Sequence, residues 1–376
     1  MTTLKAVIGA NLGDEGKGHM VDYFASKSVG PCIVVCTNGG AQRGHTVCIK
    51  DKQTHIFHHF GSGTLAGADT YLPKYFILNP IIFMQEYREF TDHNFSVYVN
   101  PNCLVSTPYD MIVNQIIEEK RGKNRHGSCG VGIWETVLRN EATLGELIVK
   151  TYEDLKNYVI GVRDTYFINR LKSKGIDVPK RWRDIYFSEE LVNCYIRDFC
   201  LMRKHIHIAE NDILRGYDSV IFENGQGLML DQNIKDQKHS TPSNTGSKNI
   251  REIIDDSIPD TDFMVEVCYV TRSYLTRHGE GYLPYEVQSI AIPNSGTETN
   301  VWNKNQGVFR YGFLDIEDIY SRCKSDFDSN MRGVTSKMSF AITHIDEQRP
   351  SSLWTITHNH PCYLSDGPYR SSILEA

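Results

Sequence analysis

GANLGDEGKG (residues 9–18) is the stretch that decides the fold of this 376-residue chain. It follows a short apolar run, LKAVIGA (residues 4–10), and precedes HMVDYFASK, in which apolar residues recur at helical spacing. A buried strand, a glycine loop and a helix in this order open a βαβ unit. Backbone N–H groups of such a loop, together with the N-terminus of the helix, bind phosphate groups. We therefore predict a nucleotide-binding loop at this junction.

The loop departs from the standard phosphate-binding motif. Lys17 is placed like the lysine of that motif, but six residues, not four, separate Gly9 from Gly16. Gly18 follows the lysine, so the usual Ser/Thr ligand for magnesium is missing. The extra residues put Asp14 and Glu15 beside the phosphates, where negative charge is costly unless it binds a metal or does chemistry. These departures argue against a generic P-loop motor or switch.

The remaining apolar runs predict an α/β fold with a mostly parallel central sheet and flanking helices. They show no polar alternation, which is typical of strands covered on both faces. The predicted strands are CIVVC (32–36), YFIL (75–78), SVIF (219–222), FMVEVCYV (263–270) and MSFAIT (338–343).

Two further segments differ in composition from the apolar runs. Residues 150–215 are charged, periodic and mostly free of glycine, which predicts a helical excursion between sheet strands. Residues 287–311 are rich in Asn, Gly, Ser and Thr and are predicted to form a long functional loop. We find no repeat or linker, so residues 1–376 are expected to form one elaborated domain.

Composition excludes several classes of protein. The chain has 40 Lys+Arg against 46 Asp+Glu, a net charge of -6, which argues against nucleic acid or a membrane surface as its main partner. No apolar run approaches the roughly 18 residues of a spanning helix. The first residues break into a glycine loop too soon for a signal peptide. The ten cysteines are scattered without a Cys-x-x-Cys pair, so neither a zinc ribbon nor a redox site is indicated. We expect a soluble, intracellular protein.

Five groups of motifs carry a family resemblance. GDEGKG, GGAQRGHT, FENGQGLMLD with TPSNT behind it, TRHGEG, and THID with SDGP occur in an order that resembles the adenylosuccinate synthetase family. The similarity runs from residue 4 to about 370 and is looser in the helical excursion. Members phosphorylate the 6-oxo group of a purine nucleotide with GTP, and the amine of aspartate then displaces the phosphate. The resemblance implies that family's P-loop-like fold and a cytoplasmic carbon–nitrogen ligase, in the host cytoplasm if the source is viral.

The resemblance also implies roles for residues around the phosphate loop. Asp14 would remove the proton from N1 of the purine, and His45 would support the charge that develops as the γ-phosphoryl group leaves. Lys17 would hold phosphates, and Mg²⁺ would be held partly by Asp14 and the carbonyl of Gly44. Asp346 would accept hydrogen bonds from the guanine edge. The implied triphosphate-binding residues are Gly13, Glu15, Gly16, Lys17, Gly18, Gly44, Thr46, His344, Asp346, Ser365, Gly367 and Pro368.

Two further groups of positions match the family's other substrates. The purine monophosphate would be bound by Gln42, Cys129, Gly130, Arg139, Gln226 and Thr241. Arg139 resembles an arginine that the family lends across a dimer interface, which implies a homodimer. The amino acid would be bound by Thr297, Thr299, Asn300 and Arg310.

The chain departs from the family's pattern at three of these places. The guanine signature Thr-Lys-x-Asp reads Thr343-His344-Ile345-Asp346, so ATP or a deoxynucleotide becomes a candidate phosphoryl donor beside GTP. The arginine-rich amino-acid loop keeps only Arg310, which leaves room for an amine donor other than aspartate. Cys129 stands where a threonine hydroxyl is usual, in a shortened loop.

These departures leave alternatives to the main hypothesis. A viral branch of the family joins aspartate to dGMP instead of IMP, and its members often replace the loop aspartate. Asp14 is retained here, which favours IMP without excluding dGMP. A nucleotide-binding regulator that no longer ligates is a third hypothesis. The joint retention of Asp14, Lys17, Gly44 and His45 argues against it, because a pure binder needs no base for N1.

Overall fold

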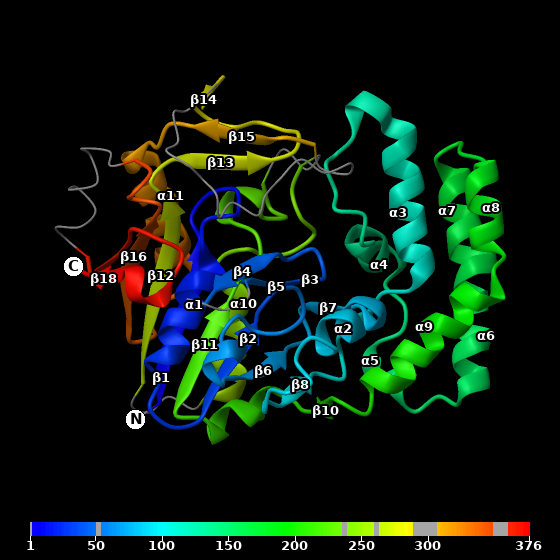
Figure 1. Ribbon diagram of the computed structural model, residues 1–376, viewed down its shortest axis with the longest axis horizontal. Coiled ribbons are helices and arrows are strands. Elements are labelled where there is room, and N and C mark those ends of the chain that lie inside the picture. The colour runs from blue at the N-terminus through cyan, green and yellow to red at the C-terminus, as the bar shows by residue number, and fades with distance from the viewer. Residues whose placement is uncertain (1, 50–53, 235–238, 259–262, 289–306, 349–359) are drawn as a thin grey trace.

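A long twisted sheet forms the centre of the computed structural model, which describes residues 2–49, 54–234, 239–258, 263–288, 307–348 and 360–376 (Figure 1). Nine of its ten described strands form a parallel series, and only β18 runs antiparallel to its neighbour. In spatial order the strands are β10 (His207–Ile208), β8 (Val97–Val99), β6 (Asp69–Leu72), β2 (Cys32–Cys36), β11 (Ser219–Glu223), β1 (Thr3–Gly9), β12 (Met264–Arg272), β16 (Ser336–Thr343), β17 (Cys362–Ser365) and β18 (Ile373–Glu375).

The predicted α/β fold with a mostly parallel sheet is therefore confirmed. Four of the runs predicted after the first strand lie in this sheet, as β2, β11, β12 and β16. YFIL is a strand, β7 (Phe76–Leu78), but it lies in a separate small sheet with β3 (Gly39–Gly40) and β9 (Leu104–Val105). Its side chains belong to the core on the helical side of the molecule, which its apolar composition alone does not distinguish from the core of the main sheet.

Apolar side chains of β1 pack on both faces of the sheet. Leu4, Ala6 and Ile8 pack in a core with α10 (Lys248–Ser257) and α11 (Ile316–Asn330). Val7 packs on the opposite face with α1 (Lys17–Ser26). Figure 1 shows α1 in front of the sheet and α10 and α11 behind it. Burial on both faces explains why the strand sequences are continuously apolar.

Helices gather at the β10 side of the sheet. The segment predicted as a helical excursion contains α6 (Tyr152–Val162), a π-helical turn (Arg163–Phe167), α7 (Ile168–Ser173), α8 (Lys180–Tyr186) and α9 (Glu189–Met202). These pack beside α2 (Pro80–Tyr87), α3 (Pro108–Arg121), α4 (Ile133–Arg139) and α5 (Leu144–Ile148), around a core of their own (Figure 1). Among the described residues, no helix has the length and apolar character needed to cross a membrane.

Two small antiparallel sheets stand at the carboxyl ends of the central strands. One pairs β4 (His45–Cys48) with β5 (Thr54–Phe57). The other has the order β13 (Leu275–His278), β15 (Phe309–Gly312) and β14 (Glu286–Val287). Most of the predicted long loop at 287–311 lies outside the described residues.

Close packing beside β2 generates a stability prediction. A Cβ added to Gly61 would lie 2.4 Å from Cβ of Val34, a fully buried residue of β2. Gly61→Ala should therefore lower the free energy of unfolding by roughly 1–3 kcal/mol, because the core has no room for the methyl group. The matched control is Gly161→Ala in α6, where nothing lies within 4 Å and alanine should stabilise by up to about 1 kcal/mol. Denaturant unfolding compares them; an unchanged midpoint for Gly61→Ala would contradict the packing argument.

Candidate functional site

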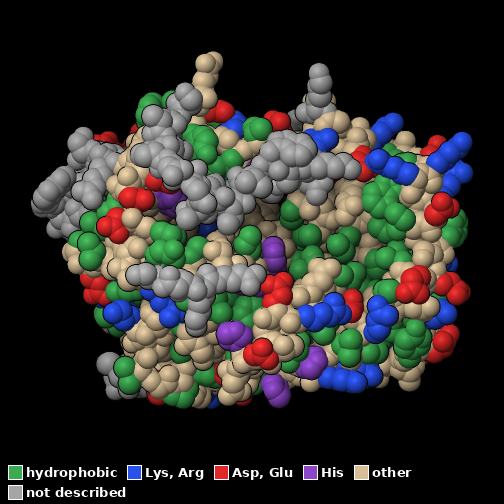
Figure 2. Space-filling view, viewed as in Figure 1, with side chains coloured by type: hydrophobic (Ala, Val, Ile, Leu, Met, Phe, Trp, Pro, Cys, Tyr) green, Lys and Arg blue, Asp and Glu red, His purple; other side chains and the backbone are tan. Residues whose placement is uncertain are grey.

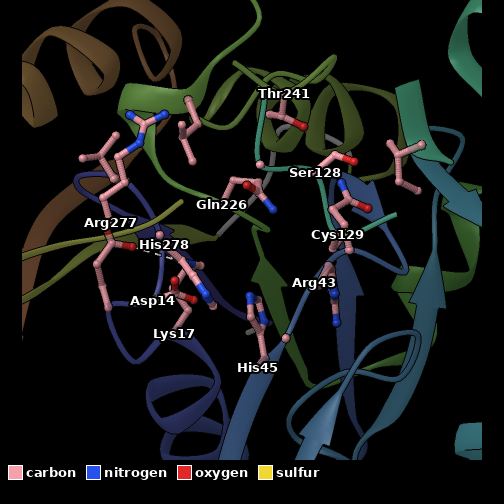
Figure 3. Close-up of a pocket in the computed structure, with 18 of the residues that line it drawn as sticks. Asp14, Lys17, Arg43, His45, Ser128, Cys129, Gln226, Thr241, Arg277 and His278 are labelled. Carbon is pink, nitrogen blue, oxygen red and sulfur yellow. Dashed lines mark hydrogen bonds and ion pairs between the residues drawn. The ribbon is translucent and has the colours of Figure 1, made fainter. Parts of the chain in front are cut away.

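One cavity of about 530 Å³ lies where the carboxyl ends of β1, β11, β12 and β16 meet loops from the helical side. The face of the molecule drawn in Figure 2 is hollowed near its middle. Ligands of open α/β sheets bind outside the carboxyl ends of the strands, so the position is the expected one. Figure 3 shows side chains from both halves of the chain pointing into this space.

The loop between β1 and α1 contains three residues with left-handed backbone conformations. Gly13 and Gly16 have φ of 92° and 93°, and Asp14 has φ of 59°. A non-glycine residue in this region carries a conformational cost of about 1 kcal/mol or more, and such residues concentrate at functional sites. The winding brings the Asp14 side chain to the cavity (Figure 3).

The second carboxylate of the loop has a different environment. Glu15 is buried, accepts a hydrogen bond from the Asn11 N–H at 2.6 Å, and pairs with Lys17 Nζ at 3.2 Å. Burial raises the pKa of Glu15, while Lys17 and the loop N–H groups oppose that rise. The two adjacent acids therefore have different surroundings. The Glu15 carboxylate is hydrogen-bonded within the loop, and the Asp14 side chain faces the cavity.

Two strand ends fix the loop from the other side of β1. Arg272, the last residue of β12, donates from Nε to the Asp14 carbonyl at 2.6 Å. Thr343, the last residue of β16, donates from Oγ1 to the Glu15 carbonyl at 2.9 Å. Side chains far apart in sequence thus hold the backbone of the two acids in place.

His45, the first residue of β4, forms a buried pair with Glu223 at the end of β11. Its Nδ1 lies 2.6 Å from Glu223 Oε1. Burial lowers the pKa of His45 to about 4, against the opposing effect of Glu223. Burial alone would raise the pKa of Glu223, but Arg43 and His45 bring it down to about 2. At neutral pH a carboxylate therefore accepts a hydrogen bond from Nδ1–H of a neutral imidazole, which fixes the ring orientation.

Four of the six residues expected to bind the purine monophosphate line the far side of the cavity: Gln42, Cys129, Gln226 and Thr241. Gln226, with φ of 65°, lies near its centre, with Thr241 and Cys129 beyond it (Figure 3). Burial raises the pKa of Cys129 to about 11, so the thiol remains protonated and able to donate weakly.

The side-chain amide of Gln42 is buried without a partner among the described residues. Leaving it unpaired costs about 1–3 kcal/mol, which indicates a group kept for a ligand. Gly130 does not line the cavity.

The residues expected at the triphosphate base lie at the other end. His344, Asp346, Ser365, Gly367 and Pro368 all line the cavity. His344 has φ of 62°, and burial lowers its pKa, so the ring is neutral. Its Nδ1 lies 2.8 Å from Thr343 Oγ1. The other expected triphosphate residues, Gly13 to Gly18, Gly44 and Thr46, also line this cavity.

Arg139 does not line the cavity of its own chain, and its expected reach into a neighbour's site stays a prediction. All five of its N–H groups donate within its own protomer: to both carboxylate oxygens of Asp110 at 3.0 and 2.9 Å, to the Val105 and Glu141 carbonyls, and to the Tyr158 hydroxyl. Its side chain is fully buried, as is that of Asp110. Extending it to a neighbour would leave Asp110 as an uncompensated buried charge. Arg139 is a structural residue of the helical side.

Of the expected amino-acid residues, only Arg310 lies within the described part of the chain. Thr297, Thr299 and Asn300 lie outside the described residues. Arg310, on β15, makes a two-point pair with Glu286 and donates to the Gly279 and Gly281 carbonyls at 2.9 Å. It does not line the cavity, so its guanidinium serves the small sheet in this structure.

Sequence reasoning missed two residues that line the cavity, Arg272 and His278, and the buried Glu223 behind its wall. Glu223, His278 and Arg272 each stand in or beside a motif already singled out, FENGQG or TRHGEG, and this nearness was the available signal. Figure 3 shows His278 close to Asp14 at the centre of the space. Only the approach of separate strand ends makes these residues functional candidates. The described residues contain no cluster of three or more His, Cys, Asp or Glu side chains suited to a metal ion.

The comparisons with known proteins agree on one family. The family model described as adenylosuccinate synthetase matches residues 6–328. Adenylosuccinate synthetase of Lactobacillus acidophilus is 26% identical over 294 residues, covering 76% of this chain but 65% of that protein. The protein of the same name from Pelodictyon phaeoclathratiforme is 26% identical over 351 residues, covering 90% of this chain and 76% of that protein.

Two solved structures share the fold. Fully ligated adenylosuccinate synthetase from Plasmodium falciparum matches with a TM-score of 0.75 at 18% identity, covering 100% of both chains. Succinoaminodeoxyadenylate synthetase (PurZ) of cyanophage S-2L, bound to dGMP and to dATP as an energy donor, matches with a TM-score of 0.66 at 13% identity, covering 100% of this chain and 95% of that chain.

The buried pair of Arg139 and Asp110 generates a stability prediction. Arg139→Met should lower the free energy of unfolding by roughly 3–5 kcal/mol, because it leaves a buried carboxylate unpaired. The matched control is Arg163→Met, whose partner Asp164 is half exposed and whose loss should cost no more than about 1 kcal/mol. Denaturant titration measures both. Equal effects would refute the structural role of Arg139.

The buried histidines generate a pH prediction. Burial lowers the pKa of His19 and of His45 from 6.5 to about 4. Below pH 6.5 the unfolded chain takes up protons that the folded protein excludes, so stability should fall from pH 6.5 towards pH 4, by roughly 3 kcal/mol per histidine. His19→Gln should reduce the pH dependence of the unfolding free energy by the contribution of one proton. Unfolding free energies at several pH values measure it, and an unchanged slope would contradict the exclusion of that proton.

Proposed function

The chain belongs to the adenylosuccinate synthetase family, and from that premise we propose that it is a carbon–nitrogen ligase. It transfers a phosphoryl group from a nucleoside triphosphate to the 6-oxo group of a purine nucleotide, then replaces the phosphate with the amine of aspartate. IMP is the proposed purine, because the loop keeps Asp14. We also propose that the chain acts as a single α/β domain in the cytoplasm.

The observation that carries the proposal is the meeting of Asp14, Lys17 and His45 on one cavity wall, opposite Gln226 and Thr241. A cavity of about 530 Å³ bounded by a phosphate loop at one end and polar side chains at the other suits nucleotide substrates. A nucleotide-binding regulator would have no use for a carboxylate held at the reaction space by a strained backbone.

In the first step, the Asp14 carboxylate takes the proton from N1 of the purine, and the electron pair moves to O6. O6 attacks the γ-phosphorus, the bond to the β-phosphate oxygen breaks, and the diphosphate leaves. Lys17 and the loop N–H groups hold the phosphates, while His45 stabilises the transferring group. The triphosphate's negative charge favours a protonated His45, so the ring can carry a proton in the complex that it lacks alone.

In the second step, the amine nitrogen attacks C6, and the C6–O bond breaks to release phosphate. Aspartate is proposed on family grounds, and the loop that would receive it carries few cations. A homodimer is likewise a family-based prediction, and Arg139 gives it no support because its guanidinium is saturated within its own protomer.

Magnesium fits the donors present at this wall. Mg²⁺ is usually held by one or two carboxylates together with substrate phosphates and water. The Asp14 carboxylate and the Gly44 carbonyl would supply the protein ligands, which is consistent with the missing hydroxyl after Lys17. Bound there, the ion would neutralise charge on the phosphates.

Two alternatives are tested against the main proposal: the same chemistry on dGMP, and nucleotide binding without ligation. The phage S-2L protein binds dGMP and uses dATP, and His344 in place of the family's lysine widens the choice of donor base. The test is phosphate release and product mass with Mg²⁺, crossing IMP or dGMP with GTP, ATP or dATP, with and without aspartate. A succinylated product from IMP supports the proposal. The same product from dGMP would assign the viral reaction, and tight nucleotide binding without turnover would assign a regulator.

The role of Asp14 gives a kinetic prediction. Asp14→Asn should lower turnover by roughly a hundredfold or more while nucleotide binding remains largely intact, because only the proton acceptor is lost. Phosphate release and nucleotide titration measure the two effects. The comparison variant, His45→Ala, should lose phosphoryl transfer to a similar extent. A near-normal rate for Asp14→Asn would show that the base is another group.

A further inference from the structure

Arg322 on α11 reaches the first half of the phosphate loop from behind the sheet. Its Nη1 donates to the Ala10 carbonyl at 2.7 Å and to the side-chain oxygen of Asn11 at 2.8 Å. Its Nη2 donates to the carboxylate of Asp318, four residues earlier on the same helix. α11 packs on the face of the sheet opposite α1, so this contact holds the loop from the side away from the loop's own helix (Figure 1).

Asn11 is the residue through which this contact acts. It is buried, and its Nδ2 donates to Thr271 Oγ1 at 2.9 Å. Its backbone N–H donates to Glu15 at 2.6 Å, and its carbonyl accepts from the Met229 N–H at 2.8 Å. Both backbone groups and both ends of the side-chain amide are therefore hydrogen-bonded, as buried polar groups require. Arg322 is the charged donor of this set.

The same residue connects the contact to the phosphate-binding lysine. The Glu15 carboxylate accepts from Asn11 through Oε1 and pairs with Lys17 Nζ through Oε2 at 3.2 Å. The position of Asn11 therefore sets that of Glu15, and Glu15 sets that of Lys17, which lines the cavity. Three residues between these points have left-handed backbone conformations, which persist only where the surrounding structure fixes them. The anchor at the start of the loop is part of that surrounding structure.

We propose that Arg322 is a positioning residue for the phosphoryl donor: it fixes Ala10 and Asn11, and through Glu15 it holds Lys17 where the phosphates bind. Arg322 does not itself line the cavity, so it acts through the loop and touches no substrate. This inference rests on the proposed function for its effect on the donor, but not for its effect on the order of the loop.

A second arginine of the chain makes the same kind of contacts away from the cavity. Arg251 on α10 pairs with Asp255, four residues later, and its Nη1 donates to the Arg332 carbonyl at 2.7 Å. The side chain of Arg251 is 28% exposed and that of Arg322 is 20% exposed, and each aspartate partner, Asp255 or Asp318, is about half exposed. Pairs with this exposure contribute little to stability. Arg251 is therefore the matched control.

The primary test is hydrogen exchange of the ligand-free protein, followed by mass spectrometry of peptides that cover residues 10–17. Arg322→Met should raise the exchange rate of these amides by roughly tenfold or more, because the anchor that opposes local opening is lost. Arg251→Met should leave that rate unchanged. Arg322→Lys keeps the charge and can donate to one of the two oxygens, so it should restore part of the protection. Unchanged exchange in Arg322→Met would overturn the proposal, whatever the activity.

Donor binding provides the second readout. Calorimetric titration of the wild-type protein with GTP, ATP and dATP in the presence of Mg²⁺ selects the nucleotide that binds most tightly. Arg322→Met should weaken its binding, and raise its KM in phosphoryl transfer, by about tenfold, because Lys17 is no longer held in place. The KM for the purine monophosphate should rise less. Arg251→Met should match wild-type protein in both. Equal rises in the two KM values would overturn the proposal.

The outcomes separate the possible failures. If wild-type protein shows no phosphoryl transfer with any pair of nucleotides, the proposed function fails while hydrogen exchange still decides the role of Arg322. If Arg322→Met does not fold, Arg322→Gln is compared with Arg251→Gln. Faster exchange of residues 10–17 in Arg322→Gln alone would support the proposal, and equal exchange in the two variants would overturn it. Faster exchange with unchanged donor binding would also overturn it.

Discussion

The pairing of β1 between β11 and β12 is the constraint on which the rest of this site depends. β1 is in parallel register with both neighbours, so the three strands end at one edge of the sheet. The phosphate loop leaves β1 there, Glu223 ends β11, and Arg272 ends β12. The hydrogen bonds of the sheet therefore set the distances between groups more than 200 residues apart. Side chains at this edge need no additional scaffold to form a ligand site, because the carboxyl ends of neighbouring parallel strands lie side by side.

Buried charge is the second organising feature. Three acids at the phosphate-loop wall have different surroundings: Glu15 has Lys17 and loop N–H groups, Glu223 has His45, Ser62 and Arg43, and Asp14 faces the cavity. A charge that is paired and hydrogen-bonded stays ionised when buried, whereas an isolated one tends to neutralise. The wall thus presents one carboxylate to the cavity and holds the other two in fixed hydrogen-bonded positions.

The helical side shows how a structure adds a competing role to a residue assigned from a motif. Arg139 stands in a segment that matches the family, yet its guanidinium is saturated by Asp110, two carbonyls and a tyrosine hydroxyl. In a sequence, a structural arginine and one that reaches a ligand look alike, since both sit on an amphipathic helix. Hydrogen-bond saturation distinguishes them, and it is a property of the fold. Arg310 illustrates the same point through its pairing with Glu286.

The sequence by itself determined the strand–loop–helix opening, the parallel sheet and the family, because apolar runs, glycines and motif order are local properties of the chain. It also identified Asp14, Lys17, His45, Gln226 and Thr241 as candidates that the fold brings to one cavity. The tertiary structure alone decided that Glu223 supports His45, that Arg43 is buried behind it, and that YFIL belongs to a second sheet. These features depend on which distant strand ends meet and on which charged side chains become buried. The local spacing of residues in the sequence determines neither. Long-range packing and desolvation are what the fold adds to the sequence.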